Sequence, residues 1–91
     1  YCPLLSAIGE KKEENALTLI KLDADVNIRN KLGVTPLHMA ADTGQERVVE
    51  ALLKKGANSR VKNDQGKIAC DYAIAKKYHN IVKMLQQQRT V

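Results

Sequence analysis

The sequence predicts an all-α solenoid, in which short helix–turn–helix units stack side by side. Three observations lead to this fold class: brief amphipathic segments that end at glycines, a self-similarity at a spacing of 33 residues, and an apolar content without large aromatic side chains. Helices this short are not stable alone, so the three observations together predict thin helical layers that stabilise one another.

The segment GVTPLHMAADTGQERVVEALLKKGA, residues 33–57, contains two short helical patterns, and each is closed by a glycine. The second pattern places four apolar residues on one helical face. They are Val48, Val49, Leu52 and Leu53. A helix of about two and a half turns is marginal in water without packing partners. The chain therefore needs neighbouring copies of the same unit.

A shift of 33 residues aligns the chain with itself. A fixed period in this range is typical of stacked repeat proteins. The shift aligns Asn30 with Asn63, and the other matching positions include glycine and apolar residues: Gly33 with Gly66, Ala40 with Ala73, Val48 with Ile81, Val49 with Val82 and Leu52 with Leu85. We interpret the chain as a single domain, residues 1–91, in which one unit is copied about three times.

The composition fits thin helical layers and disfavours a membrane protein. Of the 91 residues 44% are hydrophobic, yet there is no Phe, no Trp and only three Tyr, so Leu, Ile, Val and Ala must fill the core. No run approaches the roughly 18 apolar residues of a membrane span, and no charged-then-apolar leader opens the chain. We therefore expect a protein of the cytoplasm or nucleus that spans no membrane.

The two cysteines, Cys2 and Cys70, are 68 residues apart, which is about two repeats. Packed helices lie about 8 to 10 Å apart, whereas a disulfide needs Cα atoms within about 7 Å of each other. We therefore expect two free thiols and a reducing compartment. His38 and His79 show no metal-ligand spacing with these cysteines, so we expect no metal and no other cofactor.

The motif TPLHMA at residues 35–40, followed by ADTGQERVVEALLKKGAN, resembles the ankyrin repeat. The resemblance covers essentially the whole chain and implies an ankyrin-repeat solenoid, with helix pairs joined by β-turn or hairpin loops. It divides the chain into an incomplete first repeat (1–29), a full repeat (30–62) and a closing repeat (63–91), which we interpret as a C-terminal cap. Because the chain opens within a repeat, we expect it to be a fragment of a longer protein.

The motif residues have physical roles at helix ends. Thr35 can accept a hydrogen bond from the free N–H groups of the first helix, and Pro36 suits the first helical position, where its missing N–H costs nothing. Gly44 stands where a helix ends in a left-handed residue. Lys11 and Lys77 occupy the Gly44 position in the outer repeats. We therefore expect looser turns in those repeats.

His38 is the candidate for catalysis, because Asp71 occupies the equivalent position one repeat later. A His–Asp pair needs a nucleophile within reach, and the sequence supplies none. In proteins that this chain resembles, the motif histidine orders the turn by hydrogen bonding to the backbone, and we expect this role for His38. The chain has no P-loop, no G-x-G-x-x-G and no H-E-x-x-H motif. We therefore expect no catalytic residues and no enzyme activity.

Charge is distributed unevenly along the chain. Residues 1–45 carry five basic and six acidic side chains, whereas residues 46–91 carry ten basic and four acidic ones. A positive half can attract acidic partners over a distance. The lysine pairs at 54–55 and 76–77 lie at predicted helix C-termini, where cations are favourable, so we favour an ordinary polar surface as the explanation of the excess.

The resemblance implies a protein-binding module without chemistry of its own, because ankyrin repeats serve as rigid, concave docking surfaces. We expect another protein as the partner, with an acidic one favoured by the charge, and a chain that is monomeric or part of a larger chain. Two alternatives stay open: binding of nucleic acid or another anion through the basic half, and a purely structural cap of a longer array. The lack of interleaved aromatic residues disfavours nucleic acid.

The 33-residue period places equivalent variable positions in rows on adjacent layers. In proteins that this chain resembles, the turn tips and the inner helix face the concave, partner-binding side. The expected partner-binding residues are therefore Asn30, Lys31, Leu32, Val34, Asp42, Thr43, Asn63, Asp64, Gln65, Lys67, Tyr72 and Lys76. Leu32, an apolar residue at a turn tip, is the expected anchor for a partner. The alternative for Leu32 is an ordinary exposed leucine.

Overall fold

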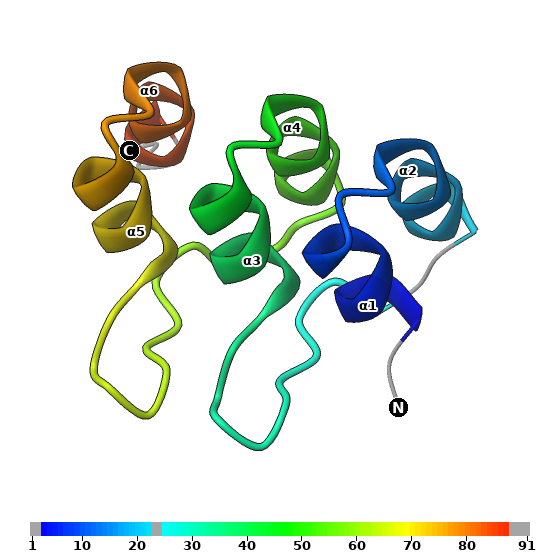
Figure 1. The fold of residues 1–91 in the computed structure, drawn as a ribbon, viewed down its shortest axis with the longest axis horizontal. Helices are drawn as coiled ribbons and strands as arrows, with labels where there is room; N and C mark the ends of the chain where they lie inside the picture. The colour runs from blue at the N-terminus through cyan, green and yellow to red at the C-terminus, as the bar shows by residue number, and fades with distance from the viewer. Residues whose placement is uncertain (1–2, 23–24, 88–91) are drawn as a thin grey trace.

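The computed structural model describes residues 3–22 and 25–87, and within these ranges it contains six α-helices and no strand. The helices are α1 (Pro3–Gly9), α2 (Glu13–Lys21), α3 (Pro36–Thr43), α4 (Glu46–Lys54), α5 (Ala69–Lys76) and α6 (His79–Gln87). They form three helix pairs that lie side by side (Figure 1). The predicted all-α repeat solenoid is confirmed.

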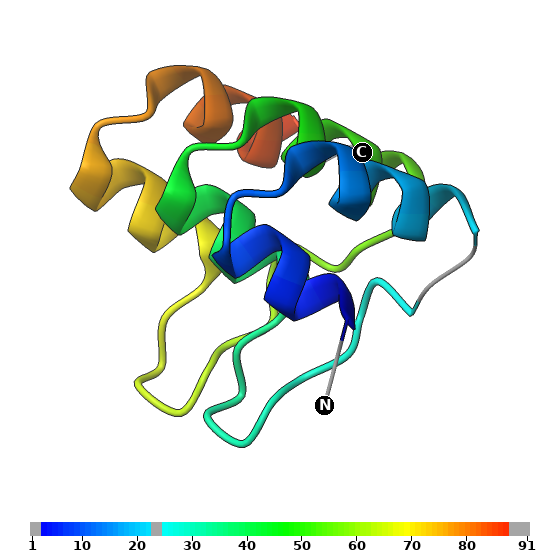
Figure 2. The same cartoon turned by 45° about the vertical axis from the view of Figure 1, so that its right-hand side comes forward.

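The helices are arranged in two rows. The inner row consists of α1, α3 and α5, and the outer row consists of α2, α4 and α6 (Figures 1 and 2). Between the helix pairs the chain forms two hairpin loops, residues 30–34 and 63–67, which project from the inner row in the same direction. We call the exposed side of the inner row, together with these two loops, the inner face.

A continuous apolar core lies between the rows. Its completely buried members, apart from the alanines, are Ile8, Val48, Val49, Leu52 and Ile81. The alanines of this core, Ala40, Ala41 and Ala73 among them, let neighbouring inner helices approach closely, because interhelix distance depends on the side chains at the contact. The core positions expected from the periodicity are therefore confirmed.

The start of α3 is built as the TPLH motif predicts. Thr35 precedes the helix, and its Oγ1 accepts a hydrogen bond from the backbone N–H of His38 at 3.2 Å. In return, Nδ1 of His38 accepts from the backbone N–H of Thr35 at 3.1 Å. Pro36 takes the first helical position. These reciprocal bonds satisfy two N–H groups at the helix start, and both predicted roles are confirmed.

The start of α5 keeps only part of this arrangement. Asp71, at the position of His38, accepts from the backbone N–H of Ile68 at 3.0 Å. Ile68 stands where α3 has Thr35, and its side chain carries no oxygen to accept a bond from the helix. The third repeat therefore begins with half of the reciprocal pair, because Ile68 and Ala69 stand where the middle repeat has Thr35 and Pro36.

The turn inside each helix pair contains one left-handed residue. Its φ is 74° at Gly44, 60° at Lys11 and 63° at Lys77. In each repeat the next residue donates its N–H to a carbonyl five residues earlier: Lys12 to Ala7 at 2.8 Å, Gln45 to Ala40 at 3.1 Å and Tyr78 to Ala73 at 2.9 Å. The expectation of looser turns at the lysines was therefore wrong. The same bond closes all three turns, although a left-handed lysine costs about 1 kcal/mol.

Gly44 differs from these lysines in what lies against it. A Cβ atom at Gly44 would be 2.8 Å from Cζ of Tyr78, which belongs to the next repeat. One repeat earlier the residue equivalent to Tyr78 is Gln45, and its side-chain amide reaches instead to the carbonyl of Ile8 at 2.7 Å. The middle turn therefore requires glycine for two reasons. The backbone is left-handed at this position, and the Tyr78 ring leaves no space for a Cβ atom.

Cys70 lies half-buried in α5 and is a free cysteine. Burial raises the pKa of its thiol, and the negative charge of Asp71 raises it further. A raised pKa lowers the thiolate fraction, so this cysteine is a poor nucleophile. Cys2 lies outside the described residues, so the expectation for the pair of thiols stays a prediction.

The first prediction concerns the core. Leu52→Ala removes buried methyl groups from the middle repeat and should lower the free energy of unfolding by about 2 to 5 kcal/mol. Denaturant unfolding followed by circular dichroism measures this loss. Leu32→Ala makes the same change at an exposed site and should cost less than about 1 kcal/mol. Equal costs for the two variants would refute the assigned core.

The second prediction concerns the middle turn. Gly44→Ala should destabilise the chain by more than about 1 kcal/mol. The alanine would have to adopt the left-handed backbone conformation of Gly44, and its methyl group would also collide with the Tyr78 ring. In a Tyr78→Ala background the collision is gone, so the same substitution should cost only about 1 kcal/mol. Unfolding curves of the four proteins give both values. The same cost in both backgrounds would show that the ring does not constrain Gly44.

Candidate functional site

An asparagine at the base of each hairpin loop holds the loop in shape. Oδ1 of Asn30 accepts from the backbone N–H groups of Leu32 and Val34, at 2.8 and 2.9 Å. The second loop repeats this arrangement, since Oδ1 of Asn63 accepts at 2.9 and 3.0 Å from the N–H groups of Gln65 and Lys67. The asparagines thus stabilise the turns that present the loop tips.

Asn63 was expected to contact a partner, and its position argues for a different role. Its side chain is buried, with 7% exposed, and Nδ2 donates to the hydroxyl of Tyr72 at 2.6 Å. A buried side chain that already uses both ends of its amide has little left to offer a partner. We therefore assign Asn63 to the support of the inner face, whereas Asn30 is exposed.

Leu32 lies at the tip of the first loop with 65% of its surface exposed, as expected. Its backbone carbonyl accepts from the N–H of Asp64 in the second loop at 2.9 Å. Farther from the tips, the guanidinium of Arg29 donates to the carbonyl of Lys62 at 3.0 Å. The two loops are therefore tied side by side, and the exposed leucine stands on a backbone held in place.

Four of the other expected tip residues are exposed to solvent: Lys31, Asp64, Gln65 and Lys67. Val34 is half-buried. The chain segments that carry the loops, 25–34 and 58–67, have five exposed basic side chains and two exposed acidic ones. The basic ones are Arg29, Lys31, Arg60, Lys62 and Lys67. This side of the molecule therefore carries a positive excess.

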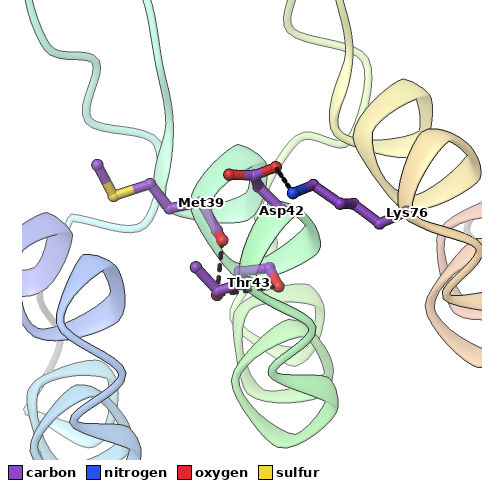
Figure 3. A network of polar contacts seen from close by, with 5 residues as sticks. Met39, Asp42, Thr43 and Lys76 are labelled. Carbon is purple, nitrogen blue, oxygen red and sulfur yellow. Dashed lines mark hydrogen bonds and ion pairs between the residues drawn. The ribbon is translucent and has the colours of Figure 1, made fainter.

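An ion pair connects the second and third inner helices (Figure 3). Oδ1 of Asp42 on α3 lies 3.8 Å from Nζ of Lys76 on α5. The 33-residue shift aligns Asp42 with Ala75, but the long side chain of Lys76, the residue after Ala75, reaches diagonally to the aspartate. Both side chains are about half exposed, and such a pair contributes at most about 1 kcal/mol, so a partner can displace it.

Thr43 was expected to face a partner, but its hydroxyl is used within the protein. It donates to the carbonyl of Met39 at 2.8 Å (Figure 3). It also accepts from Nε2 of Gln45 at 2.7 Å, and the same amide donates to the carbonyl of Ile8 in α1. Thr43 therefore serves the packing of the first repeat on the second.

Met39 belongs to the inner row, and sequence reasoning did not select it. It is half-buried on α3, and its Sδ lies 3.5 Å from the place that a Cβ at Gly9 would take, which is an ordinary van der Waals distance, so α1 and α3 are in contact here. The available signal was the 33-residue shift, which aligns Met39 with Tyr72. The flexible thioether of Met39 adds adaptable apolar surface to the inner row.

His38 joins the second repeat to the third. It is 2% exposed, and because its Nδ1 accepts from a backbone N–H, its Nε2 carries the proton and donates to the carbonyl of Lys67 at 2.8 Å. Asp71, the supposed catalytic companion, is bonded to its own helix start. The arrangement matches the expected structural role. The one hydroxyl that the described contacts place beside His38 is that of Thr35, whose Oγ1 lies 2.8 Å from Nδ1; it is buried, with 3% of the residue exposed, and it caps α3.

Among residues 3–22 and 25–87, no helix is both long and apolar enough to cross a bilayer. In the same ranges, no three side chains of the His, Cys, Asp and Glu types are grouped so that they could hold a metal ion.

Known proteins match this chain along its repeats. A family model described as "Ankyrin repeats (3 copies)" matches residues 3–90. The chain is 32% identical over 91 residues to Rabankyrin-5 of Mus musculus, covering 87% of this chain and 8% of that protein. It is 33% identical over 89 residues to Alpha-latroinsectotoxin-Lt1a of Latrodectus tredecimguttatus, covering 98% and 6%. It is 34% identical over 86 residues to Putative E3 ubiquitin-protein ligase XBAT35 of Arabidopsis thaliana, covering 92% and 19%. The chain thus spans less than a fifth of these relatives.

The third prediction tests the role of His38. His38→Asn keeps an oxygen that can cap α3, but the side chain is too short to reach the carbonyl of Lys67. It should lower the free energy of unfolding by about 1 to 3 kcal/mol, the cost of a buried group left unpaired. Asp71→Asn, the equivalent change at an exposed helix start, should cost less than about 1 kcal/mol. Urea unfolding compares the two, and equal losses would contradict the bridging role.

Proposed function

The chain belongs to the ankyrin repeat family, and from this premise we propose that it is a protein-binding module that docks a partner on its inner face and has no catalytic activity. Ankyrin repeats are in general protein–protein interaction modules. The free thiol of Cys70 supports the cytoplasm or nucleus as its location.

The observation that carries this proposal is the placement of Leu32. An exposed leucine on a freely moving loop would lose much of its binding energy in being ordered. Here the N–H of Leu32 is bonded to Asn30 and its carbonyl to Asp64. The side chain is therefore presented in advance, as an anchor for an apolar pocket of the partner.

The charge around the loops favours an acidic partner. Lys31 stands beside Leu32 in the chain, and Lys67 lies at the base of the neighbouring loop, with both side chains exposed. Complementary charge at the edge of an interface mainly speeds association and selects the partner. We propose a partner that combines an apolar side chain with carboxylates.

Nucleic acid is the first alternative, and the basic excess is the observation in its favour. Proteins that bind single strands stack bases on exposed aromatic rings. The aromatic residues of the described ranges, Tyr72 and Tyr78, are half-buried, and each ring is packed against another repeat. This arrangement disfavours stacking.

A purely structural cap is the second alternative, and it needs a polar end face. The third repeat does expose Asp71 and Gln86 at the end of the described array. Yet Ile74 is 56% exposed there, at the position where the middle repeat has the buried Ala41. The end face is therefore mixed, which favours a binding module over a dedicated cap.

The fourth prediction tests the inner face. The double variant Leu32→Ala with Lys67→Glu should bind a natural partner at least about tenfold more weakly, because it loses the anchor and reverses a charge beside it. Its free energy of unfolding should change by less than about 1 kcal/mol, since both side chains are exposed. Nuclease-treated cell extract, passed over immobilised chain at two salt concentrations, supplies the partner for calorimetry.

Lys83→Glu on α6 is the matched control, because it reverses an exposed charge on the outer row. Its affinity should equal that of the unchanged chain. If Lys83→Glu abolished binding while the double variant bound normally, the outer row would be the docking surface. A partner lost after nuclease treatment, with affinity that falls steeply with salt, would favour nucleic acid instead.

A further inference from the structure

The amide of Asn63 has an orientation fixed by the backbone of the second hairpin loop. Its oxygen accepts from the N–H groups of Gln65 and Lys67. An N–H group can only donate, so the side-chain atom that faces these two groups must be the oxygen. The opposite end of the amide, which faces Tyr72, is therefore the NH₂ group.

This orientation determines how the Tyr72 hydroxyl is used. The NH₂ group of Asn63 donates to the hydroxyl oxygen at 2.6 Å, so the hydroxyl is the acceptor in that bond. Its own hydrogen must point elsewhere, because a phenol has one O–H to donate. Among the described residues, this hydrogen bond from Asn63 is the hydroxyl's only one. The O–H of Tyr72 is thus left as a donor.

The ring that carries this hydroxyl is held as well. Its edge meets the ring of His38 at a centroid distance of 5.9 Å and an interplanar angle of 85°. His38 is buried and bonded on both ring nitrogens. Tyr72 therefore presents a donor at a fixed place, which lowers the entropy that a bound partner must remove.

The neighbouring charge indicates what acceptor fits this donor. Lys76 lies four residues after Tyr72, on the same side of α5. Its only ion pair in the described residues is the long one to Asp42. A hydroxyl donor and an ammonium group along one helix side match a segment with carboxylates, because bonds to charged acceptors are stronger than neutral ones.

We propose that the hydroxyl of Tyr72 donates to a carboxylate of an acidic peptide segment bound along α5, and that Lys76 supplies the charge for the same segment. This inference rests on the proposed protein-binding function and names the chemistry of the partner at one place. Asp42 competes with the partner for Lys76. Asn63 is a positioning residue, because it affects this contact with the carboxylate only through Tyr72.

The test is an NMR titration of the isotope-labelled chain with hexaglutamate, blocked at both ends, in about 0.15 M salt, where long-range attraction is largely screened. Blocked hexaglutamine is the control ligand. Hexaglutamate should shift the backbone signals of Tyr72 and Lys76 and the side-chain NH₂ signals of Asn63, and hexaglutamine should not. Shifts confined to the outer row, or no shifts, would overturn the proposal.

Variants separate a hydrogen bond from simple attraction. Tyr72→Phe should weaken hexaglutamate binding about tenfold, the effect of losing one bond to a charged acceptor. Tyr78→Phe removes the hydroxyl of the other described tyrosine, whose ring packs against Gly44 at the turn after α3 rather than against His38, and should change nothing. Asp42→Asn frees Lys76 and should strengthen binding. If Tyr72→Phe bound as well as the unchanged chain while Lys76→Gln bound weakly, charge alone would explain binding and the role of Tyr72 would be wrong.

Asn63→Asp covers the case in which Tyr72→Phe loosens the fold. One oxygen of the new carboxylate still accepts hydrogen bonds from the loop N–H groups. Its second oxygen accepts a hydrogen bond from the Tyr72 hydroxyl, so that the O–H group is no longer free to donate to a bound peptide. Binding should fall although the tyrosine is present, and unchanged binding would refute the inference. The proposed function is judged separately, by the Leu32 and Lys67 variants. If binding of a natural partner were weakened by the Leu32 and Lys67 variants but not by Tyr72→Phe, the protein-binding function would be supported and this inference would be overturned.

Discussion

Each short helix pair of this chain depends on the pair one repeat away. The apolar core supplies most of the free energy of that contact. Its geometry is set by side chains that reach across repeats to backbone carbonyls: Gln45 to Ile8, His38 to Lys67 and Arg29 to Lys62. The bond to Ile8 is buried, and a buried carbonyl without a donor costs about 1 to 3 kcal/mol. Together with the partly buried bond to Lys67 and the exposed bond to Lys62, it favours one register of stacking over a sliding contact. The register of stacking therefore determines where the two hairpin loops lie.

The inner face follows from the same constraint. Because Lys67 is bonded to His38 through its carbonyl and to Asn63 through its N–H, the second loop is fixed to the repeat before it and to its own base. The bond between Leu32 and Asp64 then holds the two loop tips together. In the function that we propose, exposed side chains on this frame, Leu32 above all, contact the partner. A rigid scaffold with variable exposed positions suits recognition better than catalysis.

The sequence was sufficient wherever a residue acts through its own helix. The period and the TPLH motif predicted the core around Leu52 and the cap at Thr35, because both depend on local spacing. It failed where a contact beyond a single helix decides, whether in a turn or between side chains of different segments. Lys77 is left-handed because the turn-closing bond outweighs its local preference, and Asn63 is buried because a tyrosine nine residues later reaches back to it. The diagonal pair of Asp42 with Lys76 depends on side-chain reach, which row alignment does not capture.

Mutual stabilisation of the repeats is the central claim, and native-state hydrogen exchange tests it most directly. The middle repeat packs on two neighbours, whereas in the described array each outer pair packs on one. The account therefore predicts that the slowest amides lie in α3 and α4 and exchange only on global unfolding, while amides of α1, α2, α5 and α6 also exchange through smaller, local openings. Amides in α5 and α6 that outlast those of α3 and α4 would contradict the claim, since a terminal pair would then be stable without the middle one.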